Sequence, residues 1–458
     1  MDGCAKALNS NSESFEVFSS RINLLLALDH AGRAGNAFFQ TIFDLHPEVI
    51  TCPWIHYVYS YIVTKCGTDD LIDSQVAHDY WTTQSYFQWV HNDLDEAGRN
   101  TILKFGGDPD APLDRPVIRR VFREIVLSRQ TISRRDLVLA TYYAIALGTG
   151  RDTRPMKYVL VTDSISLRFE NVFSGFSGMV VDIVLKDFPH ARIVHLIRDP
   201  RAGFASTNHQ FINSLGNMYG IRWGNSLRRL IRMWRLDFNW DCIFVFGFWL
   251  MYFRRTYQAV IRKREEHSRQ ILTLRNEDLN LRFVPTMQRL CGDLGIAMHP
   301  DWSADSWTPT MIGRPWTGTG AYNTQYQKNK YGPLPNDPDH VAKAVTGPNA
   351  YVTQRWRKRL ARNEIHLIEW FLAPELEFFG YEFLEYKPGR RQAWRWLWAL
   401  AQPLRGELPT VRWILNGRLA GGSREVLNRV FYSVVFPLYY LMSRISFLRI
   451  VAKSGILL

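Results

Sequence analysis

Short apolar runs alternate with segments of helical period along most of this chain. Four runs have the length and composition of buried strands: residues 22–28, 158–162, 191–197 and 271–274. Apolar residues at helical spacing mark the segments between or after them: residues 37–45, 178–188, 202 onward, 226–259, 284–294 and 355–379. Strands that alternate with helices predict an α/β fold, with a parallel sheet flanked by helices. Ligands of such sheets bind beyond the carboxyl ends of the strands.

A helical insertion is expected between the first two of these strands. Residues 67–115 are polar and rich in turn signals, which indicates loops and short helices rather than sheet. Two helices follow, the second starting near Ser133 with Asp136 in the position of a capping partner. We therefore assign residues 20–385 to one domain, in which about 63–150 form a helical insertion or cap.

The tail, residues 386–458, differs in composition from this domain. Of the net charge of +13, the segment from Lys387 onward carries +10, and it is also rich in Trp, Tyr and Phe. A basic, aromatic and apolar segment is typical of a membrane interface, here an anionic surface. Pro437 interrupts the apolar run 430–442, which favours a reclining or hairpin element over a span. The alternative is a helical appendage packed on the body or on a partner subunit. Nucleic-acid binding is not expected, because the basic residues alternate with long apolar runs.

Cysteine usage and the N-terminal segment bear on the compartment. Five cysteines are scattered without CxxC spacing, which argues against a zinc site and against a disulfide framework: Cys4, Cys52, Cys66, Cys242 and Cys291. Residues 1–20 are polar, lack the apolar core of a secretory signal and do not fit the myristoylation pattern. We expect a cytoplasmic protein, peripheral on the inner face of a membrane if the tail binds lipid.

A glycine-containing loop follows the first strand. Residues 30–36 (HAGRAGN) connect the strand 22–28 to the helix 37–45. This layout directs backbone N–H groups and a helix N-terminus at an anion, and Arg33 adds a fixed positive charge. The Walker sequence GxxxxGK[ST] is absent. The other interpretation is an ordinary strand-to-helix turn.

A second cation stands at the end of the strand 191–197. Arg198 follows that strand directly, and Ser206 comes eight residues later, in the helix that begins near Ala202. A guanidinium and a hydroxyl suit a phosphate group. The less favoured alternative for Arg198 is a helix-entry turn with a surface ion pair, and the alternative for Ser206 alone is a solvated helix serine.

Taken together, these stretches resemble the PAPS-dependent sulfotransferases, whose sulfuryl donor is 3′-phosphoadenosine 5′-phosphosulfate (PAPS). The family's phosphosulfate loop, (R/K)-S-G-(T/S)-(T/S) followed by a helix and often by His-Pro, is similar to Arg33-Ala34-Gly35-Asn36-Ala37 and then His46-Pro47. Its 3′-phosphate site, an Arg after a strand and a Ser eight residues on, is similar to Arg198 and Ser206. The segments LRNEDL (274–279) and 355–383 extend the resemblance.

The resemblance implies the P-loop NTPase-like fold of these enzymes, PAPS as cofactor and no metal. The phosphosulfate would be held by the loop residues Gly32, Arg33, Ala34, Gly35, Asn36 and Ala37. The 3′-phosphate would be held by Arg198 and Ser206. Asn36 and Ala37 depart from the family pattern, in which these two positions carry hydroxyls. Binding there must rest on backbone N–H groups and on the Asn36 amide.

The general base is the least determined part of the site. Family members use a Glu or a His to take the proton from the acceptor hydroxyl. The position that matches the Glu of one branch is Trp54, and the nearest titratable side chain is His56. We therefore name His56 as base and Arg33 as the cation at the transferring group. The rivals for the base are Asp163, His91 and His30.

The sequence thus predicts a sulfotransferase, similar to a bacterial carbohydrate- or lipid-type branch, that moves sulfate from PAPS to a hydroxyl. The expected acceptor is a carbohydrate or a lipid-linked glycan. Two alternatives remain: a phosphotransferase that uses the same loop, and a degenerate nucleotide-binding or membrane-associated scaffold without catalysis. The acceptor and the oligomeric state do not follow from the sequence.

Overall fold

A five-stranded parallel sheet forms the centre of the computed structural model. The structure describes residues 13–29, 34–67, 69–84, 86–164, 179–215, 219, 226–237, 242, 245–304, 306–318, 347–387, 393–408, 411 and 422–454. The sheet strands are β1 (Asn23–Asp29), β2 (Val49–Thr51), β5 (Tyr158–Ser164), β6 (Arg192–Ile197) and β7 (Ile271–Arg275). Their order is β2-β5-β1-β6-β7, and every pairing is parallel. The predicted fold class, a parallel α/β sheet flanked by helices, is confirmed.

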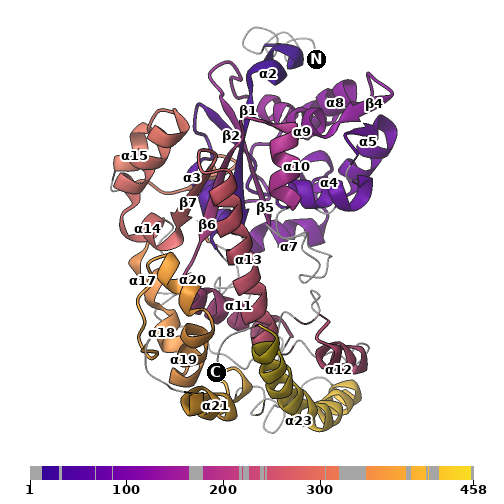
Figure 1. The fold of residues 1–458 in the computed structure, drawn as a ribbon. Coiled ribbons are helices and arrows are strands. Elements are labelled where there is room, and N and C mark those ends of the chain that lie inside the picture. The colour runs from indigo at the N-terminus through magenta and orange to yellow at the C-terminus, as the bar shows by residue number, and fades with distance from the viewer. Residues whose placement is uncertain are drawn as a thin grey trace.

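Helices cover both sides of this sheet (Figure 1). On one side lie α4 (Val58–Cys66), α9 (Arg134–Gly148) and α10 (Met179–Asp187). On the other lie α14 (Asn276–Leu281) and α15 (Phe283–Leu294). The remaining helices of this part are α2 (Phe15–Arg21), α3 (Asn36–Ile42) and α11 (Pro200–Leu215). β2 is a strand that the sequence pattern did not predict, since it is only three residues long.

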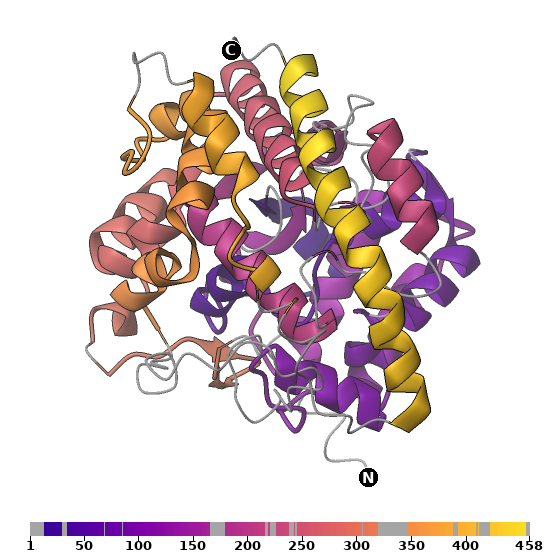
Figure 2. The ribbon, with the colours of Figure 1, turned by 90° about the horizontal axis from the view of Figure 1, so that it is seen from below.

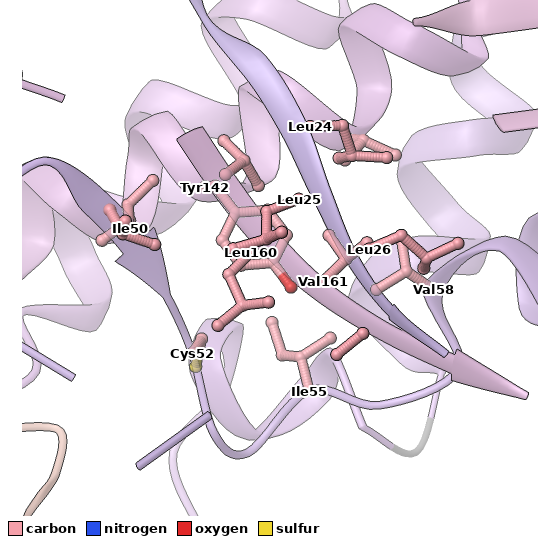
Figure 3. Close-up of a cluster of buried hydrophobic side chains, with 14 of the residues drawn as sticks. Leu24, Leu25, Leu26, Ile50, Cys52, Ile55, Val58, Tyr142, Leu160 and Val161 are labelled. Carbon is pink, nitrogen blue, oxygen red and sulfur yellow. The ribbon is translucent and has the colours of Figure 1, made fainter. Parts of the chain in front are cut away.

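Apolar burial between the sheet and its helices explains why these segments fold together. Leu25 of β1 and Leu160 of β5 pack with Val58 of α4 and Tyr142 of α9, all fully buried (Figure 3). Strands buried on both faces read as continuous apolar runs, which is the pattern that the sequence showed. Because these strands also run parallel, the carboxyl ends of β1, β5 and β6 meet at one edge of the sheet.

The insertion between β2 and β5 is mostly helical, as predicted. Its helices are α5 (Ser74–Thr83), α6 (Gln88–His91), α7 (Glu96–Lys104) and α8 (Arg115–Val126), followed by α9. The expected cap of α9 is present, because Ser133 Oγ accepts from the Asp136 N–H at 2.9 Å. Residues 67–115 were expected to contain no sheet, and this is wrong for β3 (Leu71–Asp73). β3 pairs antiparallel with β4 (Thr131–Ser133). That strand is too short to show an alternating pattern, and its partner is distant in sequence.

The predicted helix 226–259 is two helices. α12 (Ser226–Arg235) ends where Leu236 adopts a left-handed φ of 54°, and α13 (Phe246–Glu266) begins ten residues later. No glycine or proline marks this break in the sequence. The apolar start of α13 is buried, in agreement with a core helix rather than a span.

The described chain from residue 300 onward is a series of short elements and one long helix, α23. They are η3 (Pro300–Ser303), β8 (Thr310–Met311), β9 (Arg314–Pro315), α17 (Ala350–Gln354), α18 (Trp356–Arg359), α19 (Arg362–Phe371), α20 (Ala373–Phe378), α21 (Ala393–Ala401) and α23 (Gly422–Lys453). The predicted helical segment 355–379 is thus three short helices.

Pro437 does not interrupt the tail helix. α23 continues through it, so of the two elements expected, reclining or hairpin, the hairpin is wrong. Pro437 lies on the exposed side, and the opposite side of the helix packs on the body through Phe436 and Tyr439, which offsets the lost hydrogen bond. Among the described residues, Val430–Lys453 is the one helix long and apolar enough to cross a membrane by length and composition, and 39% of its most apolar window is buried.

Candidate functional site

The loop after β1 has the predicted strand–loop–helix layout. Ala34 is buried, Gly35 has a φ of +107°, and α3 begins at Asn36, followed by Ala37. Gly32 and Arg33, together with His30, lie outside the described residues. The four loop residues that the structure describes thus stand at the carboxyl end of β1, where the anion site was expected.

Gly35 lies directly against the end of another strand. A Cβ built on Gly35 would be 2.3 Å from Asn276 Nδ2, a side chain that follows β7. Asn276 is buried, and its backbone carbonyl accepts from Asn280 Nδ2 at 2.8 Å. Only glycine fits both the positive φ and this close approach. The contact joins the β1 loop to the carboxyl end of β7, two strands away in the sheet.

We expect Gly35→Ala to destabilise the protein by about 2–4 kcal/mol, more than Gly150→Ala. Both glycines have a positive φ, so each alanine carries a left-handed backbone cost of about 1 kcal/mol. A Cβ at Gly150 meets nothing within 4 Å, whereas at Gly35 it collides with Asn276. Urea unfolding of both variants measures the difference. The double variant Gly35→Ala/Asn276→Ala should recover part of the loss, and equal losses for the two glycines would contradict the close contact.

Arg198 and Ser206 belong to one connection, from β6 into α11. Arg198 follows the last residue of β6 and is only 5% exposed, and Ser206, on the second turn of α11, is 3% exposed. The Arg198 carbonyl accepts from Tyr257 Oη at 2.7 Å, and a terminal guanidinium nitrogen donates to the Val352 carbonyl at 3.3 Å. The surface ion pair and the solvated serine proposed as alternatives do not fit this burial.

A buried polar network fixes the turn that carries Arg198. The Asp199 N–H donates to Glu277 Oε1 at 3.0 Å, and Tyr381 Oη donates to Glu277 Oε2 at 3.0 Å. Asp199 in turn binds the Arg201 guanidinium through both carboxylate oxygens. Burial, and then the neighbouring Asp199 carboxylate, raise the pKa of Glu277. These contacts give Glu277 a structural role at the turn.

The short helix α17 closes the same region. Its N-cap residue Asn349 donates its backbone N–H to Asn280 Oδ1 at 3.1 Å, and Val352 accepts from Arg198. Asn280 thus contacts both Asn276 and the start of α17. Polar contacts therefore run from Asn276 through Asn280 and α17 to Arg198, and Asn276 lies against the β1 loop.

His56 lies on the other side of the β1 loop, at the end of β5. His56 Nδ1 is 3.1 Å from Thr162 Oγ1, and the Tyr57 N–H donates to the Thr162 carbonyl at 2.9 Å. The imidazole is 8% exposed and has Tyr86 and Phe105 as ring neighbours, with centroids at 5.8 and 5.7 Å. His56 precedes α4 rather than lying within a helix. Trp54, at the position of the missing Glu, is fully buried.

Of the rivals for the base, two can be placed. Asp163, the residue after Thr162, accepts from the backbone N–H and the hydroxyl of Ser60, so it anchors α4 to the sheet. His91 is buried on α6 against Phe122, within the insertion, and burial lowers its pKa to about 3. A histidine in that position is a packing residue. His56 is therefore the described histidine that shares the strand edge with the β1 loop.

The strand order arranges these groups along the carboxyl edge of the sheet. His56 is beside β5, the Gly35 loop follows β1, Arg198 follows β6 and Asn276 follows β7. Neighbouring strands are roughly 5 Å apart, so the whole series spans on the order of 15 Å. Sequence reasoning missed Asn276, although it follows a strand just as Arg198 does. It also missed Asn280 and Asn349, whose contacts have no local sequence signal.

The described part of the loop has one buried polar atom without a partner and one position that only glycine fits. Asn36 Oδ1 is buried without a hydrogen-bond partner among the described residues, and this oxygen is an acceptor that needs a donor rather than an anion. Gly35 leaves no room for a side chain, because Asn276 occupies the space beside its Cα. Among the described residues, no group of three or more His, Cys, Asp or Glu side chains could hold a metal ion.

Comparisons with known proteins give structural neighbours only. No family model matches the sequence, and no curated protein matches it. The chain is similar to the sulfotransferase domain from the Curacin biosynthetic pathway, with 10% identity and a TM-score of 0.39, covering 80% of this chain and all of that one. It is also similar to the sulfotransferase domain from the Synechococcus PCC 7002 olefin synthase, with 12% identity, a TM-score of 0.40 and coverage of 80% and 97%. Both TM-scores are below 0.5, so no conclusion about this chain rests on them.

Proposed function

We propose that this protein transfers a sulfuryl group from PAPS to a hydroxyl acceptor, a carbohydrate or a lipid-linked glycan. The observation that carries the proposal is the order of groups at the carboxyl edge of the sheet. A glycine loop and a buried arginine end adjacent strands, β1 and β6, and a histidine stands on the β5 side of the loop. The glycine loop and the arginine would bind the two anionic groups of the donor, and the histidine would take the proton of the acceptor hydroxyl.

Each residue then has one task. The β1 loop, with Gly32 to Ala37, would hold the phosphosulfate through backbone N–H groups, the Asn36 amide and the Arg33 cation. Arg198 and Ser206 would hold the 3′-phosphate and so fix the position of the donor. PAPS supplies the activated sulfuryl group, and adenosine 3′,5′-bisphosphate leaves. His56 would take the proton of the acceptor hydroxyl as the new O–S bond forms, with Thr162 orienting its ring.

Ligand binding tests the donor assignment without knowledge of the acceptor. Adenosine 3′,5′-bisphosphate should raise the melting temperature by a few degrees at saturating concentration, whereas ATP with Mg²⁺ should have a much smaller effect. Equal shifts for the two nucleotides would contradict the proposal and favour a general nucleotide site. Transfer of radiolabelled sulfate from PAPS to fractionated glycans and lipids would then identify the acceptor.

Substitution of His56 tests the base. We expect His56→Gln to reduce kcat for sulfate transfer by about 10²–10⁴-fold, while the affinity for adenosine 3′,5′-bisphosphate stays unchanged. The amide keeps a hydrogen bond to Thr162 but cannot accept the proton. The matched control is His91→Asn, a buried histidine outside the proposed site, which should alter stability rather than kcat per folded molecule. A normal kcat in His56→Gln would contradict His56 as the general base and favour Asp163 or His30.

A further inference from the structure

Apolar side chains are concentrated on the outside of three helices at one end of the molecule. Of the twenty large apolar side chains that are strongly exposed among the described residues, twelve lie on α12, α21 and α23. They are Leu227, Ile231 and Trp234 of α12, Trp394, Leu397 and Trp398 of α21, and Leu427, Val430, Val434, Leu438, Leu441 and Leu448 of α23. We call these twelve side chains the terminal face. Within each helix they recur mainly every three or four residues, so each forms a stripe.

These stripes are fixed in place by the opposite faces of the same helices. Phe447 of α23 is buried against Gly247 of α13, where an added Cβ would come within 2.9 Å of its ring. Tyr439 Oη donates to the Ser226 carbonyl of α12 at 2.8 Å. Figure 2 shows α23 lying across this end of the molecule, with α12 beside it. The exposed stripes are therefore the outward side of a packed layer, not the result of a detached tail.

The helices that carry the terminal face are also basic. They hold ten Lys and Arg residues and a single acid, Glu425, and of the ten cations Arg229 and Arg444 are buried. Arg228 and Arg235 are exposed next to the α12 stripe, and Arg449 lies over the Trp234 ring at 5.1 Å. Apolar side chains interleaved with cations suit an anionic lipid surface, where the apolar groups enter the acyl boundary and the cations meet headgroups.

We propose that the terminal face docks the protein peripherally on an anionic lipid bilayer. A second copy of the chain is disfavoured, because a symmetric contact would bring two strongly cationic surfaces together. A transmembrane α23 is disfavoured by its buried side, where Arg444 pairs with Glu407, and Ser446 Oγ donates to the Met233 carbonyl at 3.2 Å. Spanning would break these contacts and leave a charge in the hydrocarbon layer.

The position of this face suits a membrane-bound acceptor. α2, which precedes the amino end of β1, lies at the far end of the molecule from α12, α21 and α23 (Figure 1). The carboxyl ends of the strands therefore point toward the terminal face. The docking proposal itself does not rest on sulfate transfer, and its test needs no substrate.

Vesicle flotation of the full chain tests the docking. The protein should float with vesicles of phosphatidylcholine that contain about a third phosphatidylglycerol, and much less of it should float with phosphatidylcholine alone. High salt should release the bound protein. The triple variant Val434→Ser/Leu438→Ser/Leu441→Ser should lower the bound-to-free ratio by roughly tenfold or more. These side chains are 50–65% exposed, so the variant should keep its melting temperature.

The matched control changes equally exposed apolar residues elsewhere. Leu71→Ser/Val76→Ser/Leu281→Ser alters side chains that are 48–62% exposed on β3, α5 and α14, and should float like the unchanged protein. The role of charge is tested with a second variant and its control. Arg228→Gln/Arg235→Gln should weaken binding to anionic vesicles severalfold, whereas Arg119→Gln/Arg120→Gln on α8 should have no effect. Arg119 and Arg120 are likewise exposed.

Four outcomes would overturn the proposal. They are no flotation with anionic vesicles, equal losses in the terminal-face and control variants, membrane association that resists alkaline carbonate, and a concentration-dependent dimer that the serine triple variant disperses without any vesicle binding. The third outcome would show a spanning helix, and the fourth would show that a second copy covers the face. Flotation that depends on phosphatidylglycerol, salt and the terminal face supports peripheral docking.

Discussion

Replacing Arg198 with alanine should weaken binding of adenosine 3′,5′-bisphosphate by about 10–100-fold, since charge-assisted hydrogen bonds to a phosphate contribute roughly 1.5–3 kcal/mol. The guanidinium is almost fully buried at the end of β6, beside the β1 loop, with Tyr257 holding the Arg198 carbonyl. Isothermal titration at constant salt measures the loss. Arg198→Lys keeps the charge but not the planar fork, so it should recover only part of the affinity.

The choice of ligand makes this result specific. Adenosine 5′-monophosphate lacks the 3′-phosphate, so Arg198→Ala should change its binding much less than that of the bisphosphate. Equal losses for both nucleotides would mean that Arg198 supports the fold of the site rather than the 3′-phosphate. No loss for either would remove Arg198 from the cofactor site and with it the main support for PAPS.

Local sequence signals were sufficient for the parts of the site that stand at strand ends. The Gly35 loop and Arg198 each follow an apolar run, and parallel strands bring their carboxyl ends to one edge. The apolar runs are buried as predicted, with Leu25, Leu160 and Val194 all fully inside. Fold class and the placing of these groups on one edge could therefore be predicted, because both follow from burial and from the direction of the strands.

Contacts between segments far apart in sequence could not be predicted in the same way. Asn276 against Gly35, and Tyr381 against Glu277, pair residues more than a hundred positions apart. Nothing in the composition of either segment specifies the partner. The helix that continues through Pro437 packs on α13 and α12, which overrides the local preference, and the left-handed turn at Leu236 has no glycine to mark it.

The buried ion pairs of Arg201, in the turn that carries Arg198, should stabilise the folded protein. Arg201 is 3% exposed, pairs with Asp199 at 2.7 Å and with Glu369, and lies over the Trp356 ring at 4.5 Å. Arg201→Met keeps an apolar stem over Trp356 but leaves two buried carboxylates without their cation. We expect a loss of about 3–5 kcal/mol, measured as a shift of the urea transition.

Arg154 provides the matched control for Arg201. It pairs with Asp152, two residues earlier, just as Arg201 pairs with Asp199, but both partners are exposed, at 56% and 40%. Arg154→Met should therefore shift the urea transition far less than Arg201→Met, because water screens the surface pair. Similar losses for the two variants would mean that burial does not strengthen the Arg201 pairs. The expected result is a large loss of stability for Arg201→Met alone, with binding of adenosine 3′,5′-bisphosphate weakened less than in Arg198→Ala. This result would show that Arg201 holds the turn and that Arg198 holds the phosphate.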